Sequence, residues 1–383
     1  MLTQSAPLEV SRTQRHTVSK IAVGLTADNR LFVAGITSGK PSGQPAVLST
    51  QIEPFGNNNW QPGYLQLSGP VGMNYLTDLV VAAGNNFSHA VGLGNDSNIY
   101  CAGSENAGHW TPGAGLLSQG QTFLPGTLSA QIINTATVFA LSNLGAPWVA
   151  AYRDQQAQPQ WKPGYALPNP TGATFKQLAA RPDTSDLGST HAIGLTTGGQ
   201  AVEVATAQGS GTGAGNWSPG AGVLGQASGL PAFVQLLAIS GDNSGNFHVI
   251  GLGVDGSVWD IDQYMATAAA PMWTKVSHLI APAGTHGQGK IGCYVGSGLS
   301  LNLVAWQGSQ LTVFACFTAS WSTTTTVIPT SGIASEWHLA ANCEGLVGTE
   351  FILGVAGTGL VYELAYLNSH GAWEAGAQVP INQ

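Results

Sequence analysis

Tryptophan is the residue whose spacing most clearly suggests chemistry in this chain. Seven of the eleven tryptophans recur at intervals of 48 to 56 residues, and four of the seven begin the motif Trp-x-Pro-Gly. An indole offers a flat apolar face and one N–H donor, and the residue before each motif tryptophan adds an amide or an imidazole. A pyranose presents an apolar C–H face and a fringe of hydroxyls, so these pairs are candidate sugar-binding residues. They are Asn59 and Trp60, His109 and Trp110, Gln160 and Trp161, and Asn216 and Trp217.

The same tryptophans fit a structural role, in which each ring packs one repeat on the next and Pro-Gly turns the chain. Both roles stay open, and one ring can serve both. The last three repeats keep Trp273, Trp321 and Trp373 but have lost Pro-Gly. No sugar-binding residues are assigned in those three repeats.

Histidines and acids recur at fixed places in the repeats. His89, His191 and His248 each stand three residues before a glycine, and we expect them to form hydrogen bonds or fill structural positions. No metal site and no cofactor are expected, because equivalent positions in different repeats point away from one another and the four cysteines form no Cys-x-x-Cys pair. The cysteines read as buried thiols. Turn carboxylates that cap their own backbone are expected at Asp28, Asp96 and Asp255.

Motifs for catalysis are missing from the sequence. A sialidase needs an arginine cluster and a tyrosine nucleophile with an acidic partner, whereas the five arginines here all lie in the first half. The acidic residues form no distinctive pair, and no Gly-x-Ser-x-Gly elbow, phosphate loop or His-Glu-x-x-His motif occurs. The sequence therefore predicts a binding protein that is not an enzyme. A propeller glycosidase or sialidase and a protein-interaction propeller remain the alternatives.

The elements that would position these residues form an internal repeat. A five-residue apolar segment recurs as IAVGL from Ile21, HAVGL from His89, TVFAL from Thr137, HAIGL from His191, HVIGL from His248, NLVAW from Asn302 and FILGV from Phe351. Turn residues such as Asp-Gly or Gly-Gly and a second apolar segment follow each copy, which is typical of a β-hairpin. A further β-rich segment precedes most hairpins and the tryptophan segment follows, so one unit reads as four short strands.

Four antiparallel strands per unit of about 50 residues predict a propeller blade. The fold class is therefore all-β, a seven-bladed β-propeller of four-stranded antiparallel blades that forms one domain over residues 1–383. A parallel β-helix repeats at shorter intervals, and a β-sandwich shows no tryptophan period. The expected blades cover approximately residues 8–70, 71–125, 126–170, 171–228, 229–285, 286–332 and 333–383.

Composition narrows the partners. Charged residues make up 8% of the chain and the formal net charge is −8, with no basic run, so nucleic acid is excluded as a main ligand. No window approaches a membrane span, so no membrane insertion is expected, and residues 1–20 lack the apolar stretch of a signal peptide. We expect a cytoplasmic protein, or one released by a non-classical route, whose partners are external glycans.

The hairpins Gly92-Leu93-Gly94-Asn95-Asp96 and Gly251-Leu252-Gly253-Val254-Asp255-Gly256, with the Trp-x-Pro-Gly-x-Gly segments from Trp110 and Trp217, resemble the Photorhabdus-type seven-bladed propeller lectins, relatives of the tectonin-like sugar binders. The resemblance spans nearly the whole chain and is poorest in the last two units. It implies a lectin for fucose and O-methylated glycans, with shallow sites repeated around the ring. It leaves formation of a homo-oligomer open.

Overall fold

The computed structural model describes 24 segments of the chain. These are residues 17–25, 31–38, 45–51, 60–67, 76–84, 87–106, 109–118, 120–132, 136–153, 160–182, 189–207, 217–225, 229–240, 246–265, 272–284, 291–295, 301–307, 310–317, 320–328, 338–340, 350–355, 359–367, 373–375 and 378–379. The predicted site residues Asn59 and Asn216, and the predicted turn residue Asp28, lie outside these segments.

The described strands form seven antiparallel sheets, which we call blades 1 to 7. Blade 1 contains β1 (Val18–Leu25), β2 (Leu31–Thr37), β3 (Pro45–Gln51) and β4 (Trp60–Gln66), and blade 2 contains β5 (Leu76–Gly84), β6 (Phe87–Gly94), β7 (Ile99–Asn106) and β8 (His109–Leu116). Blade 3 contains β9 (Ser129–Ile132), β10 (Ala136–Leu141), β11 (Pro147–Arg153) and β12 (Trp161–Ala166), and blade 4 contains β13 (Phe175–Pro182), β14 (Thr190–Thr196), β15 (Ala201–Ala207) and β16 (Trp217–Val223). Blade 5 contains β17 (Phe233–Ser240), β18 (Phe247–Gly253), β19 (Val258–Met265), β20 (Met272–Trp273) and β21 (His278–Ala281). Blade 6 contains β22 (Ile291–Val295), β23 (Leu301–Gln307), β24 (Gln310–Phe317) and β25 (Ser320–Ile328), and blade 7 contains β26 (His338–Ala340), β27 (Glu350–Val355), β28 (Val361–Leu367) and β29 (Trp373–Ala375).

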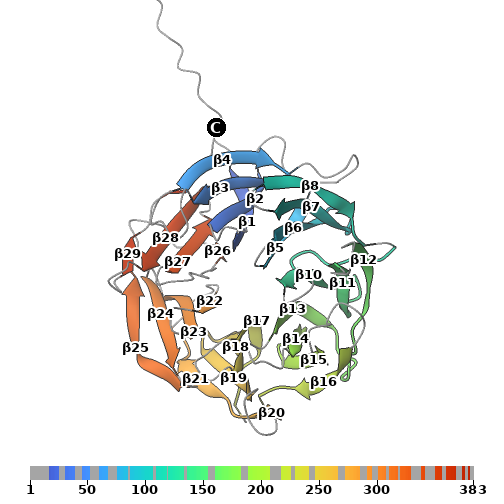
Figure 1. The fold of residues 1–383 in the computed structure, drawn as a ribbon. Helices are drawn as coiled ribbons and strands as arrows, with labels where there is room; N and C mark the ends of the chain where they lie inside the picture. The colour runs from blue at the N-terminus through green and yellow to red at the C-terminus, as the bar shows by residue number, and fades with distance from the viewer. Residues whose placement is uncertain are drawn as a thin grey trace, which may run out of the picture.

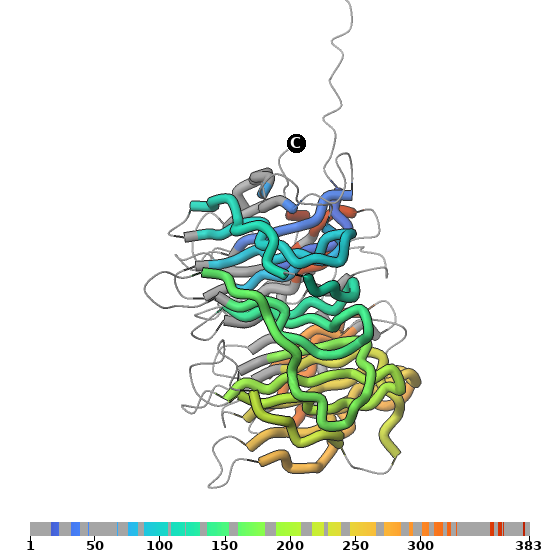
Figure 2. The backbone as a smooth tube through the Cα atoms, turned by 90° about the vertical axis from the view of Figure 1, so that its right-hand side faces the viewer, coloured from blue at the N-terminus to red at the C-terminus, as the bar shows by residue number. Residues whose placement is uncertain are grey.

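The blades stand radially around one axis, with the first strand of each blade inside and the fourth at the rim (Figure 1). Seen from the side, the sheets stack into a thick disc (Figure 2). The predicted all-β class with four-stranded antiparallel sheets is confirmed, and the number of sheets in the described segments equals the number of sequence units. Within those segments no helix has the length and apolar character to cross a membrane. The residue ranges assigned to the blades stay predictions.

The first copy of the repeat was wrongly assigned. IAVGL lies in β1, the innermost strand of its blade, whereas HAVGL lies in β6, the second strand of blade 2. The second strand of blade 1 instead carries Phe32-Val33-Ala34-Gly35-Ile36, and Gly35 lies 57 residues before Gly92. Gly24, the residue that the repeat had suggested, lies 68 residues before Gly92, far outside the other intervals. Inner and second strands are both short, apolar and rich in small residues, so their sequence patterns look alike.

The hairpin turns carry the predicted carboxylates. Asp96 Oδ1 accepts the backbone N–H of Asn98 at 3.1 Å, and Asp255 Oδ1 accepts that of Ser257 at 3.0 Å. Gly256, at the following turn position, has a φ of 79°, which a side chain would disfavour. These contacts fix the reversal between the second and third strands, so the turn role of both carboxylates is confirmed.

One backbone hydrogen bond recurs between successive blades. The residue that opens an inner strand donates its N–H to a carbonyl in the turn between the second and third strands of the preceding blade. This bond joins Phe175 to Gly145 at 3.0 Å, Phe233 to Gly199 at 2.8 Å, and Val18 to Gly359 at 2.8 Å. The last of these bonds joins blade 1 to blade 7. The ring therefore closes with the same bond that links its internal neighbours, and each sheet is built from consecutive strands.

Polar side chains two residues further along the inner strands add a second link. Gln177 accepts the N–H of Leu236 at 2.9 Å and donates to its carbonyl at 2.7 Å, which fastens blade 4 to blade 5. Gln235 makes the same pair of bonds to β22, at 3.0 and 2.9 Å. Lys20 and Asp78 occupy this place in β1 and β5 and form an ion pair between blades 1 and 2. Neighbouring inner strands are thus held at side-chain as well as backbone level.

The Pro-Gly motif has a steric cause. The glycines of three motifs lie against the backbone of the neighbouring third strand, and a Cβ placed on any of them would overlap a carbonyl group there. None of the three has a positive φ, so space and not backbone conformation requires glycine. The motif glycines Gly113, Gly164 and Gly220 meet the carbonyls of Cys101, Val149 and Glu203 respectively.

Replacing Gly164 by Ala is expected to destabilise the ring by about 1–3 kcal/mol, the usual cost of forcing extra atoms into a packed site. Urea unfolding followed by tryptophan fluorescence measures this loss. Gly198→Ala is the control, because a Cβ there meets only the Thr196 hydroxyl, at 3.8 Å. Equal stabilities for the two variants would show that the close approach at Gly164 relaxes without cost.

Candidate functional site

The described motif tryptophans pack between blades. Each ring at the start of an outer strand lies against a side chain of the preceding blade's second strand. The ring centroids are 5.0 Å apart for Trp110 and Phe32, 5.3 Å for Trp161 and His89, 5.6 Å for Trp217 and Phe139, 5.6 Å for Trp273 and His191, and 6.4 Å for Trp321 and His248. The packing role that the sequence left open is therefore present in five repeats.

Burial separates the predicted sugar-binding residues. Trp217 is only 9% exposed, whereas Trp110 and Trp161 are half-buried. The residues before them, His109 and Gln160, are exposed to solvent. The structure therefore places His109 with Trp110, and Gln160 with Trp161, at two separate blade boundaries.

The predicted site in blade 1 is only partly within the described segments. Trp60 opens β4, as Trp110 is the second residue of β8, so its backbone takes the expected place at the start of an outer strand. Its side chain lies outside the description, and the two asparagines predicted beside Trp60 and Trp217 do as well. The sugar-binding role of all eight residues stays a prediction.

A buried carboxylate joins blades 4 and 5. Glu203 Oε1 lies 2.6 Å from His191 Nδ1, and Oε2 accepts the backbone N–H of Ala221 at 2.6 Å. The indole N–H of Trp273, from the next blade, also donates to Oε2 at 2.8 Å. Glu203 is 3% exposed, so these bonds replace the water that burial removes. The carboxylate therefore fastens the tryptophan of one blade to the histidine of the blade before it.

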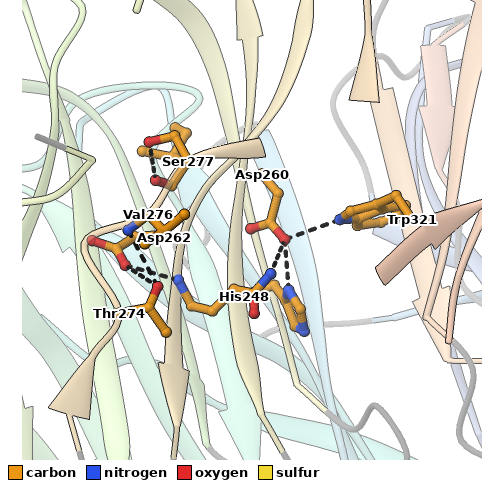
Figure 3. A network of polar contacts seen from close by, with 9 residues as sticks. His248, Asp260, Asp262, Thr274, Val276, Ser277 and Trp321 are labelled. Carbon is orange, nitrogen blue, oxygen red and sulfur yellow. Dashed lines mark hydrogen bonds and ion pairs between the residues drawn. The ribbon is translucent and has the colours of Figure 1, made fainter. Parts of the chain in front are cut away.

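Blades 5 and 6 repeat this arrangement. Asp260 Oδ2 lies 2.9 Å from His248 Nδ1, and it accepts bonds from the Gln263 side chain at 2.8 Å and the Trp321 indole at 2.9 Å. Figure 3 shows Trp321 reaching across the boundary to the Asp260 carboxylate. We call each histidine, carboxylate and tryptophan set an acid latch. An acid latch contains no exposed nucleophile, so its geometry suits structural support and not catalysis.

A spacing signal for the acid latches was present in the sequence and was missed. Glu203 follows His191 by 12 residues, and Asp260 follows His248 by the same interval. Sequence reasoning named these two acids only as unpaired glycosidase candidates. The two strands of a hairpin pair residues that lie symmetrically about the turn, so a fixed spacing across a hairpin of fixed length places the side chains together.

Other boundaries carry no acid at the equivalent place. In blade 3 this place is held by Val149, which pairs with Phe139 as Glu203 pairs with Ile193. The indole N–H of Trp217, which faces blade 3, is buried and has no hydrogen-bond partner. The boundary between blades 3 and 4 is thus an apolar version of the acid latch.

Asp262 organises the broken outer strand of blade 5. Its Oδ1 accepts the N–H of Lys275 at 2.8 Å and the Thr274 hydroxyl at 3.1 Å, within the segment between β20 and β21 (Figure 3). Its Oδ2 accepts the N–H of Gly225, from blade 4, at 3.2 Å. Burial raises the pKa of Asp262 above its ordinary value of 3.8, although these bonds and one from the Gln263 N–H act in the opposite direction. Lys275 has a φ of 60°, which accompanies the break in the strand.

Metal-binding groups do not gather in the described segments, where no set of three or more His, Cys, Asp or Glu side chains could hold an ion. Cys101 and Cys316 are buried thiols, as predicted, whereas Cys293 is only half-buried. Cys343 lies outside the described residues.

Comparisons with known proteins support the fold and leave the function undecided. No protein-family model matches the chain, and no curated protein matches it in sequence. AofleA from Arthrobotrys oligospora is similar in structure, with 13% identity, a TM-score of 0.50, and coverage of 82% of this chain and 86% of that one. The WD40 domain of SCAP from fission yeast aligns over 99% of this chain and 89% of its own, with 10% identity and a TM-score of 0.51. Prolyl oligopeptidase B from Galerina marginata aligns over 96% of this chain and 51% of its own, with 10% identity and a TM-score of 0.52.

Identities this low show the fold alone. The chain is a β-propeller protein. Because one fold hosts many activities, its function has to be argued from the residues at its blade boundaries.

The Trp273 and Trp217 indoles form a matched pair for testing the acid latch, since both are buried to nearly the same extent, at 8% and 9% exposure. Replacing either by Phe removes similar volume, but only Trp273→Phe also removes a donor from a buried carboxylate. We expect Trp273→Phe to cost about 1–3 kcal/mol more in unfolding free energy than Trp217→Phe. Chemical denaturation of both variants measures the difference, and equal losses would contradict the role of the indole N–H.

Asp262 should give stability a pH dependence of definite sign. A raised pKa means that the folded state holds the proton more tightly than the unfolded state, so this contribution is present at low pH and is lost as pH rises through the raised pKa. The unfolding free energy of the wild type minus that of Asp262→Asn is therefore expected to fall from acidic to neutral pH. Urea titrations across that range measure it, and a difference that rises with pH would contradict the assignment.

Proposed function

We propose that the chain is a lectin that binds carbohydrate at several shallow sites around the ring, without catalysis. One observation carries the proposal. At two successive blade boundaries a half-buried indole stands beside an exposed polar side chain, Trp110 with His109 and Trp161 with Gln160. The partly exposed ring offers apolar surface for sugar C–H groups, and the polar neighbour offers hydrogen bonds to hydroxyls.

Packing between blades supports this use of the rings. Trp110 meets Phe32 with an interplanar angle of 77°, and Trp161 meets His89 at 72°. Edge-to-face contacts of this kind fix the plane of each indole before any ligand arrives. A fixed ring loses little freedom on binding, so more of the contact energy remains as affinity.

Each proposed site is small, so a single sugar would bind weakly. The ring holds its sites at fixed separations, and a branched glycan or a glycan-covered surface can engage several at once. The expected partners are therefore multivalent glycans outside the producing cell, which the chain would reach by a non-classical route. Fucose and O-methylated sugars are the proposed ligands, on the resemblance of the Trp-x-Pro-Gly-x-Gly segments to the Photorhabdus-type lectins.

Buried acids support a binding role over hydrolysis. A glycosidase needs two carboxyl groups facing the same bond, one of them free to exchange protons with the substrate. Glu203 and Asp260 are almost fully buried and are engaged by histidine and indole groups across blade boundaries. Their bonds hold the ring together, so these acids are assigned to structure.

Gln160→Ala and His109→Ala are expected to weaken glycan binding severalfold without lowering stability, because both side chains are exposed. A glycan array followed by calorimetry with the best ligand measures the affinity. The double variant should lose more than either single variant when the ligand is multivalent, because avidity depends on the number of sites.

Thr171→Ala is the control, since Thr171 is exposed in the connection that follows β12. It should leave glycan binding unchanged. Glycan binding that survives the double variant would reject these two sites. A protein that binds no glycan at all, or that hydrolyses one, would reject the lectin proposal itself.

A further inference from the structure

The outer strand of every blade is a sheet edge, and an open edge can pair with another chain. Natural sheets prevent this with proline, bulges, charge or short strands. Four outer strands here carry a proline as the third residue of their motif, namely Pro62 in β4, Pro112 in β8, Pro163 in β12 and Pro219 in β16. In β4, β8 and β16 the pairing register also shifts next to the motif, which marks a bulge.

Two further outer strands are protected by other means. Blade 5 splits its edge into β20 and β21, with Lys275 in a left-handed conformation between them. Blade 7 ends in β29, which has three residues and includes Glu374. Interruption, shortness and charge all discourage a further strand from pairing.

The outer strand of blade 6 has none of these features. β25 runs for nine residues with the sequence Ser-Trp-Ser-Thr-Thr-Thr-Thr-Val-Ile, without proline, glycine or charge. Thr323 to Ile328 is a continuous β-branched run, and Val327 is 48% exposed. Among the described strands β25 forms a ladder with β24 alone, and four consecutive residue pairs, from Leu311 with Ile328 to Phe314 with Thr325, keep one register.

Charge indicates which strand would pair with this edge. The whole chain has a formal net charge of −8, so two copies repel one another through most of their surfaces. β25 is uncharged, and two copies can meet there without facing like charges. An antiparallel pair of identical strands related by a two-fold axis is self-complementary, and Thr–Thr pairs across strands are favourable.

We infer that residues 323–328 of β25 form the interface of a homodimer, in which the edges of two blade 6 sheets pair antiparallel into one continuous sheet. The two rings then lie rim to rim, and the outer strands of blades 1 to 4 lie elsewhere on each rim (Figure 1). This inference does not depend on carbohydrate binding.

Charge placed at the edge tests the inference through repulsion and rescue. The wild type is expected to double its mass in light scattering as its concentration rises, and amide hydrogen exchange in residues 323–328 should slow in parallel. Thr325→Lys and Thr325→Glu should each remain monomeric, because like charges would meet near the two-fold axis. Mixing the two variants should restore a dimer, which a misfolded strand could not do.

Ser218→Lys is the matched control, since Ser218 is exposed on β16, an outer strand that proline protects. It should dimerise like the wild type. A wild type that stays monomeric at every concentration would overturn the inference. Dimerisation that persists in both Thr325 variants, or slowed exchange that appears only when an extended peptide of another sequence is added, would do so as well.

Discussion

A four-stranded sheet has two faces, and each blade can bury both only against its two neighbours. Every other feature of this chain depends on that constraint, because the first blade must meet the last. The backbone bond from the first residue of an inner strand into the preceding blade's turn satisfies it repeatedly. Val18 makes this bond to Gly359 as Phe233 makes it to Gly199, so the seam between the chain's two ends is built like an internal boundary.

Side chains make the boundaries differ from one another. Between blades 4 and 6 the acid latches bury carboxylates, which costs desolvation, and histidine and indole donors offset that cost. Between blades 3 and 4 the equivalent place is apolar, and the Trp217 N–H has no acceptor. A carboxylate facing the wrong blade would lose its partners. Such groups therefore favour one order of neighbours around the ring, whereas aliphatic contacts alone would accept several.

The sequence was sufficient to predict the fold class, since alternating apolar strands, turn residues and a tryptophan period all point to blades. It was misleading where two strands of one blade share a composition, and IAVGL in β1 was taken for a second strand. The acid latches could not be found by comparing motifs, because Glu203 and Asp260 occupy a place that Val149 holds in blade 3. Contacts between blades join residues far apart in the chain, such as Glu203 and Trp273, and no local pattern records which blade supplies the partner.

The motif that first suggested chemistry is largely explained by architecture. Its glycine has no room for a Cβ, its proline leaves a sheet edge without a donor, and its tryptophan fills the space between blades. Repetition of the motif is therefore evidence for blades and not by itself for sugar sites. Information about ligands has to lie in the exposed residues that vary from blade to blade. His109 and Gln160 differ in chemistry although they occupy equivalent places beside half-buried indoles. Sites built on this ring should consequently differ in specificity, and a branched ligand that matches their order would bind best.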